Sequence, residues 1–524
     1  MLLDGLPLVV LSSHDTEIPV ADEPWVLIMG TLYILMILAI GVWGWTQTDN
    51  IHDFLITGKS LGIWVVALTI FSVIQSGFGF IGGPELLYEF GTSALWIFFT
   101  APIGFLAAWI LVGKRMRILA DVRDVLTLAD GMYVRYDSEW VRGLTGLVVV
   151  VAVLGYLAVN LAALQFVMRA IFGIPLAWGL FGGGAIILFY CLIGGMIAGV
   201  WTDFVQGITM IIGGVIVFVL ALSFGGGMEN ISRNLAASDP SLIGPFGALG
   251  AGTAIAWWIL FSMGSVGQVH SITKFYMISD VTLLKWGAPI AAISYGLSSL
   301  LAFSTGLSMR AMVEAGEIPE DFTASETMPV FVLDHTPEVV AGLILAGLLA
   351  AIMSTSDSFL NIAAAAITRD IPRSLGRPIQ NQHLELRLTQ ASLAGVTIGA
   401  LLIVHFSDAL VGILGVIGWG LFAASIFPIV ALGLNWKGAT PEGAVAALIV
   451  GLVFNLWYDV LPTALTILGW EGLAGNVVAT YPFPEAFVVG TAAMLVSTIA
   501  FIVVSLYTQA DHVVPEDVAI VMER

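Results

Sequence analysis

Residues 71–91 read FSVIQSGFGFIGGPELLYEFG, an apolar stretch that is long enough to enter a membrane yet poorly suited to a continuous helix. The residues that weaken the helix are Gly77, Gly79, Gly82, Gly83 and Pro84. A glycine costs about 1 kcal/mol relative to alanine in a helix, and a proline costs about 3 kcal/mol. A second stretch, WWILFSMGSVGQVH at residues 257–270, carries Gly264 and Gly267. In lipid, broken backbone is tolerated only where it lines a cavity or packs against protein, so both stretches predict interrupted helices inside a bundle.

The composition indicates the fold class. The chain has 524 residues, of which 58% are hydrophobic and 10% are charged, and its mean hydropathy is +0.98. Globular proteins carry roughly a quarter charged residues, so most of this chain must face lipid or itself. A spanning helix needs about 20 mainly apolar residues, and we predict an all-α polytopic membrane protein with about thirteen spans. The predicted spans are residues 25–46, 62–82, 93–113, 140–170, 175–195, 197–223, 250–270, 284–311, 337–368, 387–406, 407–433, 440–460 and 485–508.

The two interrupted stretches fall in the second and seventh of these spans, five helices apart. Matched breaks in two halves of a chain are typical of transporters with inverted repeats, whose binding site lies at the breaks. The alternative is that the glycines only allow close packing between helices. The clustering of glycines at matched positions favours the first interpretation.

Basic residues predict the orientation, because cytoplasmic loops carry an excess of Lys and Arg. With the N-terminus outside, 15 of the 18 Lys and Arg lie on the cytoplasmic side, and Lys274 is counted among them. We therefore predict an extracellular N-terminal tail (residues 1–24), a cytoplasmic C-terminal tail (residues 509–524) and a place in the plasma membrane.

The acidic loops and several missing motifs exclude other classes of protein. The net charge is −19 with a pI near 4.6, which predicts a halophilic source or, alternatively, merely acidic loops. A nucleic-acid partner is excluded because it requires a basic patch. The sequence contains no GxxxxGK[ST] motif of an ATP-driven motor and no HExxH motif of an intramembrane enzyme. Cys191 is the only cysteine, so no intrachain disulfide can form, and we expect no cofactor.

Residues 349–360, LAAIMSTSDSFL, place a polar cluster within another apolar span. At about 100° per residue, one side of this helix carries Ala351, Ser354, Thr355, Asp357 and Ser358, while Ser356 falls roughly opposite. Serines in membrane helices often bond back to their own helix. An aspartate at the centre of such a helix costs about 2.5–3.5 kcal/mol and usually marks an ion path. Oxygen ligands with one carboxylate predict a site for a small cation such as sodium.

A second aspartate lies in IGGMIAGVWTDFVQG, residues 193–207. Asp203 sits near the predicted cytoplasmic end of the sixth span. By itself it is equally consistent with a charge at a helix terminus. Two aspartates with hydroxyl neighbours in one membrane domain support a cation route.

GGMIAGVWTDFVQ and AAIMSTSDSFLNIAAAAITRDI resemble the two signature stretches of the sodium/solute symporter family, which includes proline, pantothenate, monocarboxylate, sialic acid and sugar symporters. DFLITGKSLG (53–62), TLADGMYVRY (127–136) and GQVHSITKFYMISD (267–280) resemble the same family in the expected order. The resemblance covers about residues 25–510. It implies a LeuT-like core of two inverted five-helix repeats, with a peripheral helix before it and two helices after it. These units are residues 62–223 and 250–433 for the repeats, 25–46 for the peripheral helix and 440–508 for the last two helices.

The resemblance also implies cation ligands. Unwinding at residues 72–79 would free backbone carbonyls, and the principal sodium site would use those of Ser72 and Gln75. The ninth helix would add the Ala351 carbonyl and the hydroxyls of Ser354 and Thr355. Some relatives bind a second sodium ion, and the matching residues here are Asp203, Ser354, Asp357 and Ser358. A carboxylate at 357 would strengthen that second site or carry a proton instead.

The solute pocket is expected at the middle of the bilayer, beside the sodium site. Its predicted liners are Gln75, Ser76, Phe78 and Gly79 from the second span and Phe261, Ser265 and Gln268 from the seventh. Proline symporters place an acidic residue where Ile74 stands and a proline where Val269 stands, so the resemblance does not extend to proline as the substrate. We expect a small organic solute of the carboxylate or amino acid type.

These observations together predict a secondary active transporter that is not an enzyme. It would carry the solute with sodium by alternating access, a population shift driven by differential binding. Its expected partners are sodium ions, the solute and the lipid bilayer. The alternatives are a proton-coupled symporter of the same fold and a channel or sensor built on this scaffold.

Overall fold

The computed structural model describes residues 24–46, 61–123, 125–406, 411–467, 470–479 and 486–523. Most of the predicted N-terminal tail, residues 53–60 of one family-like stretch and Arg524 lie outside these ranges. Within them the chain is helical and contains no strand, apart from an isolated parallel bridge between Leu61 and Ile278.

The helices follow one another with short connections. Those of the first half are α1 (Pro24–Trp45), α3 (Ile63–Ile74), α4 (Gly83–Phe90), α5 (Leu95–Ala108), α6 (Lys114–Val122), α7 (Leu128–Tyr136), α8 (Glu139–Phe172), α9 (Leu176–Phe224) and α10 (Met228–Ser238). Those of the second half are α11 (Gly250–Met263), α12 (Val269–Phe275), α13 (Leu284–Glu314), α14 (Thr327–His335), α15 (Glu338–Ala365), α16 (Ile371–Ser374), α17 (Gln382–His405), α18 (Val411–Phe427), α19 (Pro441–Asn455), α20 (Leu461–Ile467), α21 (Glu471–Ala479), α22 (Ala486–Thr508) and α23 (Glu516–Glu523).

Ten helical segments in the described ranges are long and apolar enough to cross a membrane. The other three predicted spans coincide with shorter helices: α3, the Leu176–Leu192 part of α9, and α11. The spans predicted at 175–195 and 197–223 form one continuous helix, α9, where we expected two. The multi-pass helical class is therefore confirmed, and the number thirteen stays a prediction.

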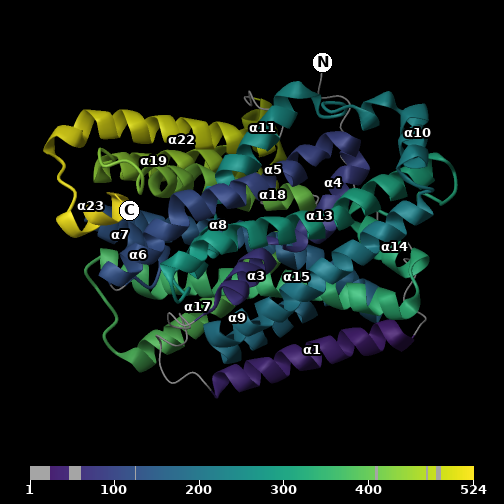
Figure 1. The fold of residues 1–524 in the computed structure, drawn as a ribbon, viewed down its shortest axis with the longest axis horizontal. Coiled ribbons are helices and arrows are strands. Elements are labelled where there is room, and N and C mark those ends of the chain that lie inside the picture. The colour runs from purple at the N-terminus through teal and green to yellow at the C-terminus, as the bar shows by residue number, and fades with distance from the viewer. Residues whose placement is uncertain are drawn as a thin grey trace.

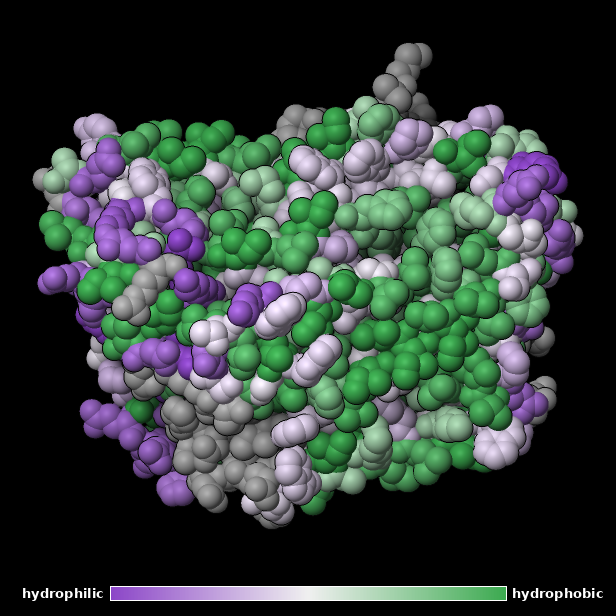
Figure 2. Space-filling model, viewed as in Figure 1, coloured by the Kyte–Doolittle hydropathy of each residue, from purple (hydrophilic) through white to green (hydrophobic). Residues whose placement is uncertain are grey.

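The surface divides along one axis of the molecule. Hydrophilic residues gather around α7 and α23 at one end and around α10 at the other, and a broad hydrophobic band separates them (Figure 2). The long helices α1 and α22 lie roughly along this axis (Figure 1). Such a band, flanked by polar ends, is what a bundle needs to sit in a bilayer with its helices crossing the hydrocarbon layer.

Both predicted helix breaks are present. The helix α3 ends at Ile74, Gln75 and Ser76 leave the helix, and a π-helical turn over Phe78–Gly82 leads into α4. The second break runs through a 3₁₀ turn, Gly264–Gly267, and the extended Gln268 before α12 begins. The first break is shorter than the predicted unwinding over residues 72–79, because Ser72 and Val73 still lie in the last turn of α3.

Neighbouring helices press against the glycines of these breaks. A Cβ atom on Gly77 would lie 2.6 Å from the Cβ of Ala163 in α8. The Gly77 N–H group donates to the Asn160 Oδ1 atom of α8 at 3.0 Å. A Cβ atom on Gly267 would lie 2.8 Å from the backbone nitrogen of Phe427 in α18. The broken backbone is thus shielded from lipid by α8 and α18, as its polar groups require.

Candidate functional site

The serine-rich stretch of α15 lies directly against the end of α3. The Ser354 hydroxyl donates to the Ser72 carbonyl at 3.2 Å, and the Thr355 hydroxyl donates to the Val73 carbonyl at 3.0 Å. The same two hydroxyls lie 3.0 and 3.1 Å from the Ala351 carbonyl. Five oxygen atoms therefore meet at one point between α3 and α15, and all the residues that carry them are buried.

This cluster has the chemistry of a monovalent cation site. The carbonyls of Ser72 and Val73 belong to the last turn of α3, where the helix has no further N–H groups to offer them. The C-terminal end of a helix also carries partial negative charge. The five oxygens include no carboxylate, whereas calcium sites typically include several. Unwound carbonyls and half-helix ends are the groups that coordinate sodium in broken-helix transporters.

The predicted ligands differ from this cluster at one position. Gln75 was expected to contribute its carbonyl, but the second α3 carbonyl that contacts α15 is that of Val73. The reason is the short break: α3 stays helical through Ile74, so its last-turn carbonyls already point to α15. The Gln75 backbone N–H group donates to the Phe71 carbonyl at 2.9 Å, which closes the helix.

The remaining polar residues of α15 face elsewhere. The Ser356 hydroxyl donates to the Ile352 carbonyl of its own helix at 2.7 Å, on the side opposite the oxygen cluster. Asp357 faces α9, where a Cβ atom on Gly199 would lie 2.7 Å from the Asp357 Oδ2 atom. Of the residues predicted for a second cation site, Asp357 thus lies against α9, whereas Ser354 belongs to the contact with α3.

Asp203 of α9 is buried, but its partner is one that the sequence did not predict. The Lys274 Nζ atom lies 3.3 Å from the Asp203 Oδ2 atom, and the lysine side chain is only 2% exposed. Lys274 was counted among the cytoplasmic basic residues beyond the span 250–270. Its side chain does not lie in an exposed loop, because α12 continues the broken helix to Phe275 and keeps Lys274 buried in the bundle, while its side of the membrane stays a prediction.

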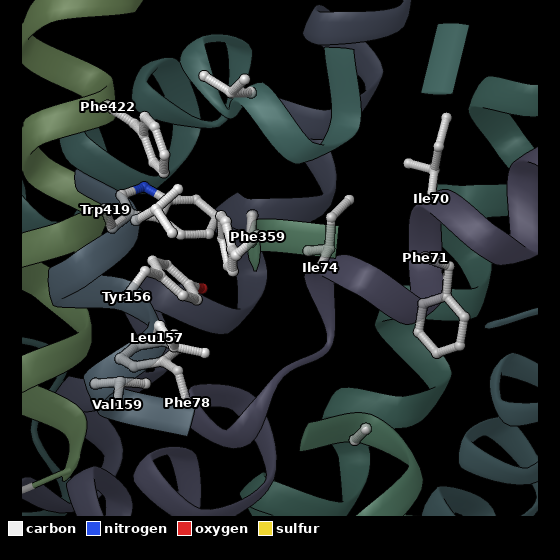
Figure 3. Packing of buried hydrophobic residues seen from close by; sticks show 14 of the residues in the cluster. Ile70, Phe71, Ile74, Phe78, Tyr156, Leu157, Val159, Phe359, Trp419 and Phe422 are labelled. Atoms are coloured by element: carbon white, nitrogen blue, oxygen red, sulfur yellow. The ribbon is translucent and has the colours of Figure 1, made fainter. Parts of the chain in front are cut away.

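Aromatic rings surround the two breaks. The Phe78 and Phe261 rings stack with centroids 5.6 Å apart, and Phe261 stacks on Trp419 of α18 at 4.9 Å. Figure 3 shows Trp419 near Tyr156 of α8 and Phe359 of α15, and the Tyr156 and Phe359 centroids are 4.6 Å apart. The rings come from five different elements and leave apolar faces around the unwound segments.

Several buried polar atoms within this aromatic shell have no hydrogen-bond partner among the described residues. They are the Gln75 Oε1 and Nε2 atoms, the Gln268 Oε1 atom, both ring nitrogens of His270 and the Trp419 Nε1 atom. Buried polar groups nearly always have partners, so such a group of unpartnered atoms calls for water or a ligand. Donors and acceptors without partners are thus present among aromatic rings, the two kinds of group that line pockets for small molecules.

The predicted liners do not all share this arrangement. Ser76 lies 3.4 Å from the Tyr156 hydroxyl, and Gln75 folds over Gly79. Ser265 instead donates to the Phe261 carbonyl of its own helix and packs against Gly104 of α5, so its side chain does not join the other liners.

Four residues of this region were not predicted as site residues: Tyr156, Asn160, His270 and Trp419. Asn160 offered a signal, since it is a lone amide in the apolar segment YLAVNLAAL. For the aromatic residues no sequence signal separated them from the many rings that only pack.

Two polar clusters flank the site along the membrane axis. Toward α14, the Glu85 carboxylate accepts from the Ser325 hydroxyl and from the Gly412 N–H group at 2.7 Å. Toward α7, the buried Asp130 faces three arginines, whose nearest nitrogens lie 3.5–3.7 Å from it; they are Arg142, Arg369 and Arg373. The Glu85 cluster joins α4 to α18 and to the turn before α14, and the Asp130 cluster joins α7 to α8, α16 and the π-helical turn Ala366–Asp370.

The comparison with known proteins decides the family. The family model described as "Sodium:solute symporter family" matches residues 54–451, more than half of the chain. The chain belongs to this family. The symporter is 28% identical to sodium/proline symporter 2 of Staphylococcus saprophyticus over 475 residues, 87% of this chain and 91% of that one. It is 29% identical to the sodium/pantothenate symporter of Escherichia coli over 472 residues, 87% of this chain and 94% of that one.

Solved structures confirm the fold. The symporter superposes on a sodium-coupled sialic acid symporter with a TM-score of 0.70 at 18% identity, covering 92% of this chain and 98% of that one. It also resembles MhsT, solved in complex with L-phenylalanine, with a TM-score of 0.50 at 14% identity over 84% of this chain and 99% of that one. The predicted LeuT-like core with broken second and seventh helices is thereby confirmed, while the exact bounds of the repeats stay predictions.

The predicted function class is confirmed with the family. This symporter moves a small organic solute together with sodium, and it is a transporter, not an enzyme.

Proposed function

We propose that the oxygen cluster between α3 and α15 is the site of the coupling sodium ion. The observation that carries the proposal is the direct contact of the Ser354 and Thr355 hydroxyls with the Ser72 and Val73 carbonyls. In this structure both hydroxyls donate hydrogen bonds to these carbonyls. A hydroxyl also has lone pairs and can rotate to offer them to a cation. Because none of the five oxygens belongs to a titratable group, the cluster favours sodium over a proton as the coupling ion.

We propose further that the solute carries a carboxylate on a small apolar body. The unpartnered Gln75 amide and Trp419 indole are donors that suit a carboxylate, and the Gln268 carbonyl is an acceptor that suits an amine. The faces of Phe261 and Tyr156 suit the apolar part. None of the described residues named in this shell is a carboxylate, lysine or arginine, so the positive charge that faces the solute would be the bound sodium itself. Proline, pantothenate and sialic acid, which the relatives' names give, all carry a carboxylate.

The two flanking clusters mark the two ends of the proposed transport pathway, one on each side of the membrane. The α7 end, which holds the arginines around Asp130, is the cytoplasmic side by the excess of basic residues. The N-terminus then lies outside, and the protein sits in the plasma membrane. The Glu85 cluster would close the extracellular side and the Asp130 cluster the cytoplasmic side. Opening each in turn, with the site unchanged between them, is alternating access driven by differential binding of sodium and solute.

A thermal-shift screen of the purified symporter tests the ion and the solute class together. Amino acids and short carboxylic acids are screened, each beside its own amide, in sodium chloride and in potassium chloride. We expect stabilisation by at least one carboxylate, not by its amide, and only with sodium. Uptake of that carboxylate into proteoliposomes should follow an imposed sodium gradient and not a pH gradient. Stabilisation by amides as strong as by acids, or uptake driven by pH alone, would contradict the proposal.

A further inference from the structure

The half-helix that follows the second break carries a buried lysine in an ion pair. Lys274 of α12 is 2% exposed, and its Nζ atom lies 3.3 Å from the Asp203 Oδ2 atom of α9, whose side chain is fully buried. Removing two charges from water costs several kcal/mol each, and the cost is recovered only when they are well paired. A lysine in a loop would keep its ammonium group in water. Lys274 is instead buried and paired with Asp203, and this position is a specific feature of the fold.

A second carboxylate lies beside the pair. Asp357 of α15 is 1% exposed and approaches α9 at Gly199, where a side chain would collide with its Oδ2 atom. It accepts a hydrogen bond from the Asn361 amide at 3.3 Å. Gly199 lies four residues before Asp203 on the same face of α9, so the two carboxylates meet α9 one turn apart. The Lys274 ammonium is thus paired with one of two buried carboxylates that come from different helices to the same face of α9.

These carboxylates belong to the predicted second cation site, with Ser354 and Ser358. Two oxygens there, Asp203 Oδ1 and Ser358 Oγ, have no hydrogen-bond partner within the described ranges, so the site has the acceptors that a cation needs. Two neighbouring carboxylates in a membrane interior stay ionised only beside a positive charge. Lys274 supplies such a charge from the protein itself, at Asp203, one of the predicted ligands of that site.

We propose that Lys274 is a tethered cation that occupies the second cation site, so that this symporter binds one sodium ion instead of two. The inference rests on the proposed sodium site at Ser354 and Thr355, which holds the single mobile ion. Removing the ammonium should open the Asp203–Asp357 site to a second sodium ion.

The test counts bound sodium directly and needs no knowledge of the solute. Radioactive ²²Na⁺ binding to the full-length purified protein is measured at saturation and mildly alkaline pH, where free carboxylates are ionised. We expect one ion per chain for the wild type and for Lys274→Arg, which keeps the charge. Lys274→Met should bind two. The double variant Lys274→Met with Asp203→Asn should return to one, because it removes the anion together with the ammonium.

The outcomes separate this inference from the proposed sodium site. A wild-type count of two overturns the tethered cation and leaves the first site intact. A count of one sodium ion in the Lys274→Met variant also overturns it, provided that this variant elutes as a folded protein. Lys274→Gln provides a second uncharged variant if the methionine variant does not fold. If the wild type binds no sodium, the proposed site at Ser354 and Thr355 has failed instead. The wild-type count alone can refute the inference, whatever the variants do.

Discussion

Replacing both hydroxyls of the proposed sodium site is the sharpest test of the contact between α3 and α15. The double variant Ser354→Ala with Thr355→Ala removes two of five oxygen ligands and leaves the three backbone carbonyls. A hydrogen bond or contact to a charged group is worth about 1.5–3 kcal/mol. Two such losses amount to about 3–6 kcal/mol in the sodium-bound protein, against about 2 kcal/mol for the two hydrogen bonds that the sodium-free protein loses. Sodium binding should therefore weaken by about 1–4 kcal/mol, and because each 1.4 kcal/mol is a factor of ten, the sodium concentration for half-maximal binding should rise about 5-fold to several hundred-fold.

The same change affects the sodium-free protein much less. There the two hydroxyls make ordinary hydrogen bonds to the Ser72 and Val73 carbonyls, each worth about 1 kcal/mol. We therefore expect a folded double variant whose thermal stability is modestly lower in potassium chloride, and which gains almost nothing when sodium replaces potassium. Sodium titrations followed by thermal shift and by ²²Na⁺ binding measure both quantities on one preparation.

Ser356→Ala is the matched control. Ser356 lies on the same helix and is equally buried, but its hydroxyl donates to the Ile352 carbonyl on the opposite side of α15. Its removal should leave the sodium affinity unchanged. If the double variant retained wild-type sodium affinity, or if Ser356→Ala weakened it equally, the assignment of the ion to the α3–α15 contact would be refuted.

Three further changes test the surroundings of the site. Gly199→Ala would place a methyl group 2.7 Å from the Asp357 Oδ2 atom and should lower the melting temperature. Gly213→Ala is the control and should not lower it, because nothing lies within 4 Å of a Cβ atom there. Equal effects of the two variants would contradict the close approach of α9 and α15. Glu85→Ala removes the acceptor that joins α4 to α18 and should increase thiol labelling of a cysteine placed in the pocket from the extracellular side; unchanged labelling would show that Glu85 does not hold that side closed. Asp130→Asn removes the anion among three arginines and should cost about 3 kcal/mol of stability, the range for breaking a buried ion pair, and an unchanged melting temperature would show that the arginines do not depend on it.

The membrane bundle and its two breaks were predictable because they depend on local properties of the chain. An apolar run of about 20 residues predicts a membrane span, and a cluster of glycines weakens the helix that contains it. Neither effect depends on distant parts of the chain. The depth of each break was not predictable in this way. Whether α3 ends at Ser72 or at Ile74 depends on Asn160 and Ala163 of α8, which hold the chain at Gly77 from outside the segment.

The oxygen cluster was predictable in part for the same reason. Helical periodicity places Ser354 and Thr355 together on one side of α15, and this follows from sequence spacing alone. Which carbonyls they meet depends on how two helices dock. Because α3 stays helical through Ile74 and does not unwind from residue 72, the carbonyl that Thr355 meets is that of Val73 and not that of Gln75, the predicted ligand. The solute shell was the least predictable part, since Trp419 and Tyr156 reach it from α18 and α8, two helices without a break, and nothing in the sequence separates these rings from those that only pack.

Lys274 shows how a broken helix changes the interpretation of charge. The excess of Lys and Arg in cytoplasmic loops assigns a basic residue by its distance from the last apolar run. That distance assumes that a span ends after about 20 residues. An interrupted span is longer, because its unwound segment adds residues without completing the crossing, and α12 carries the chain on to Phe275. A basic residue a few positions beyond such a span therefore lies in the core, and it can remain there only beside an anion. In this symporter the anion is Asp203, so the second break, which lengthens the seventh span, brings Lys274 into the bundle beside it.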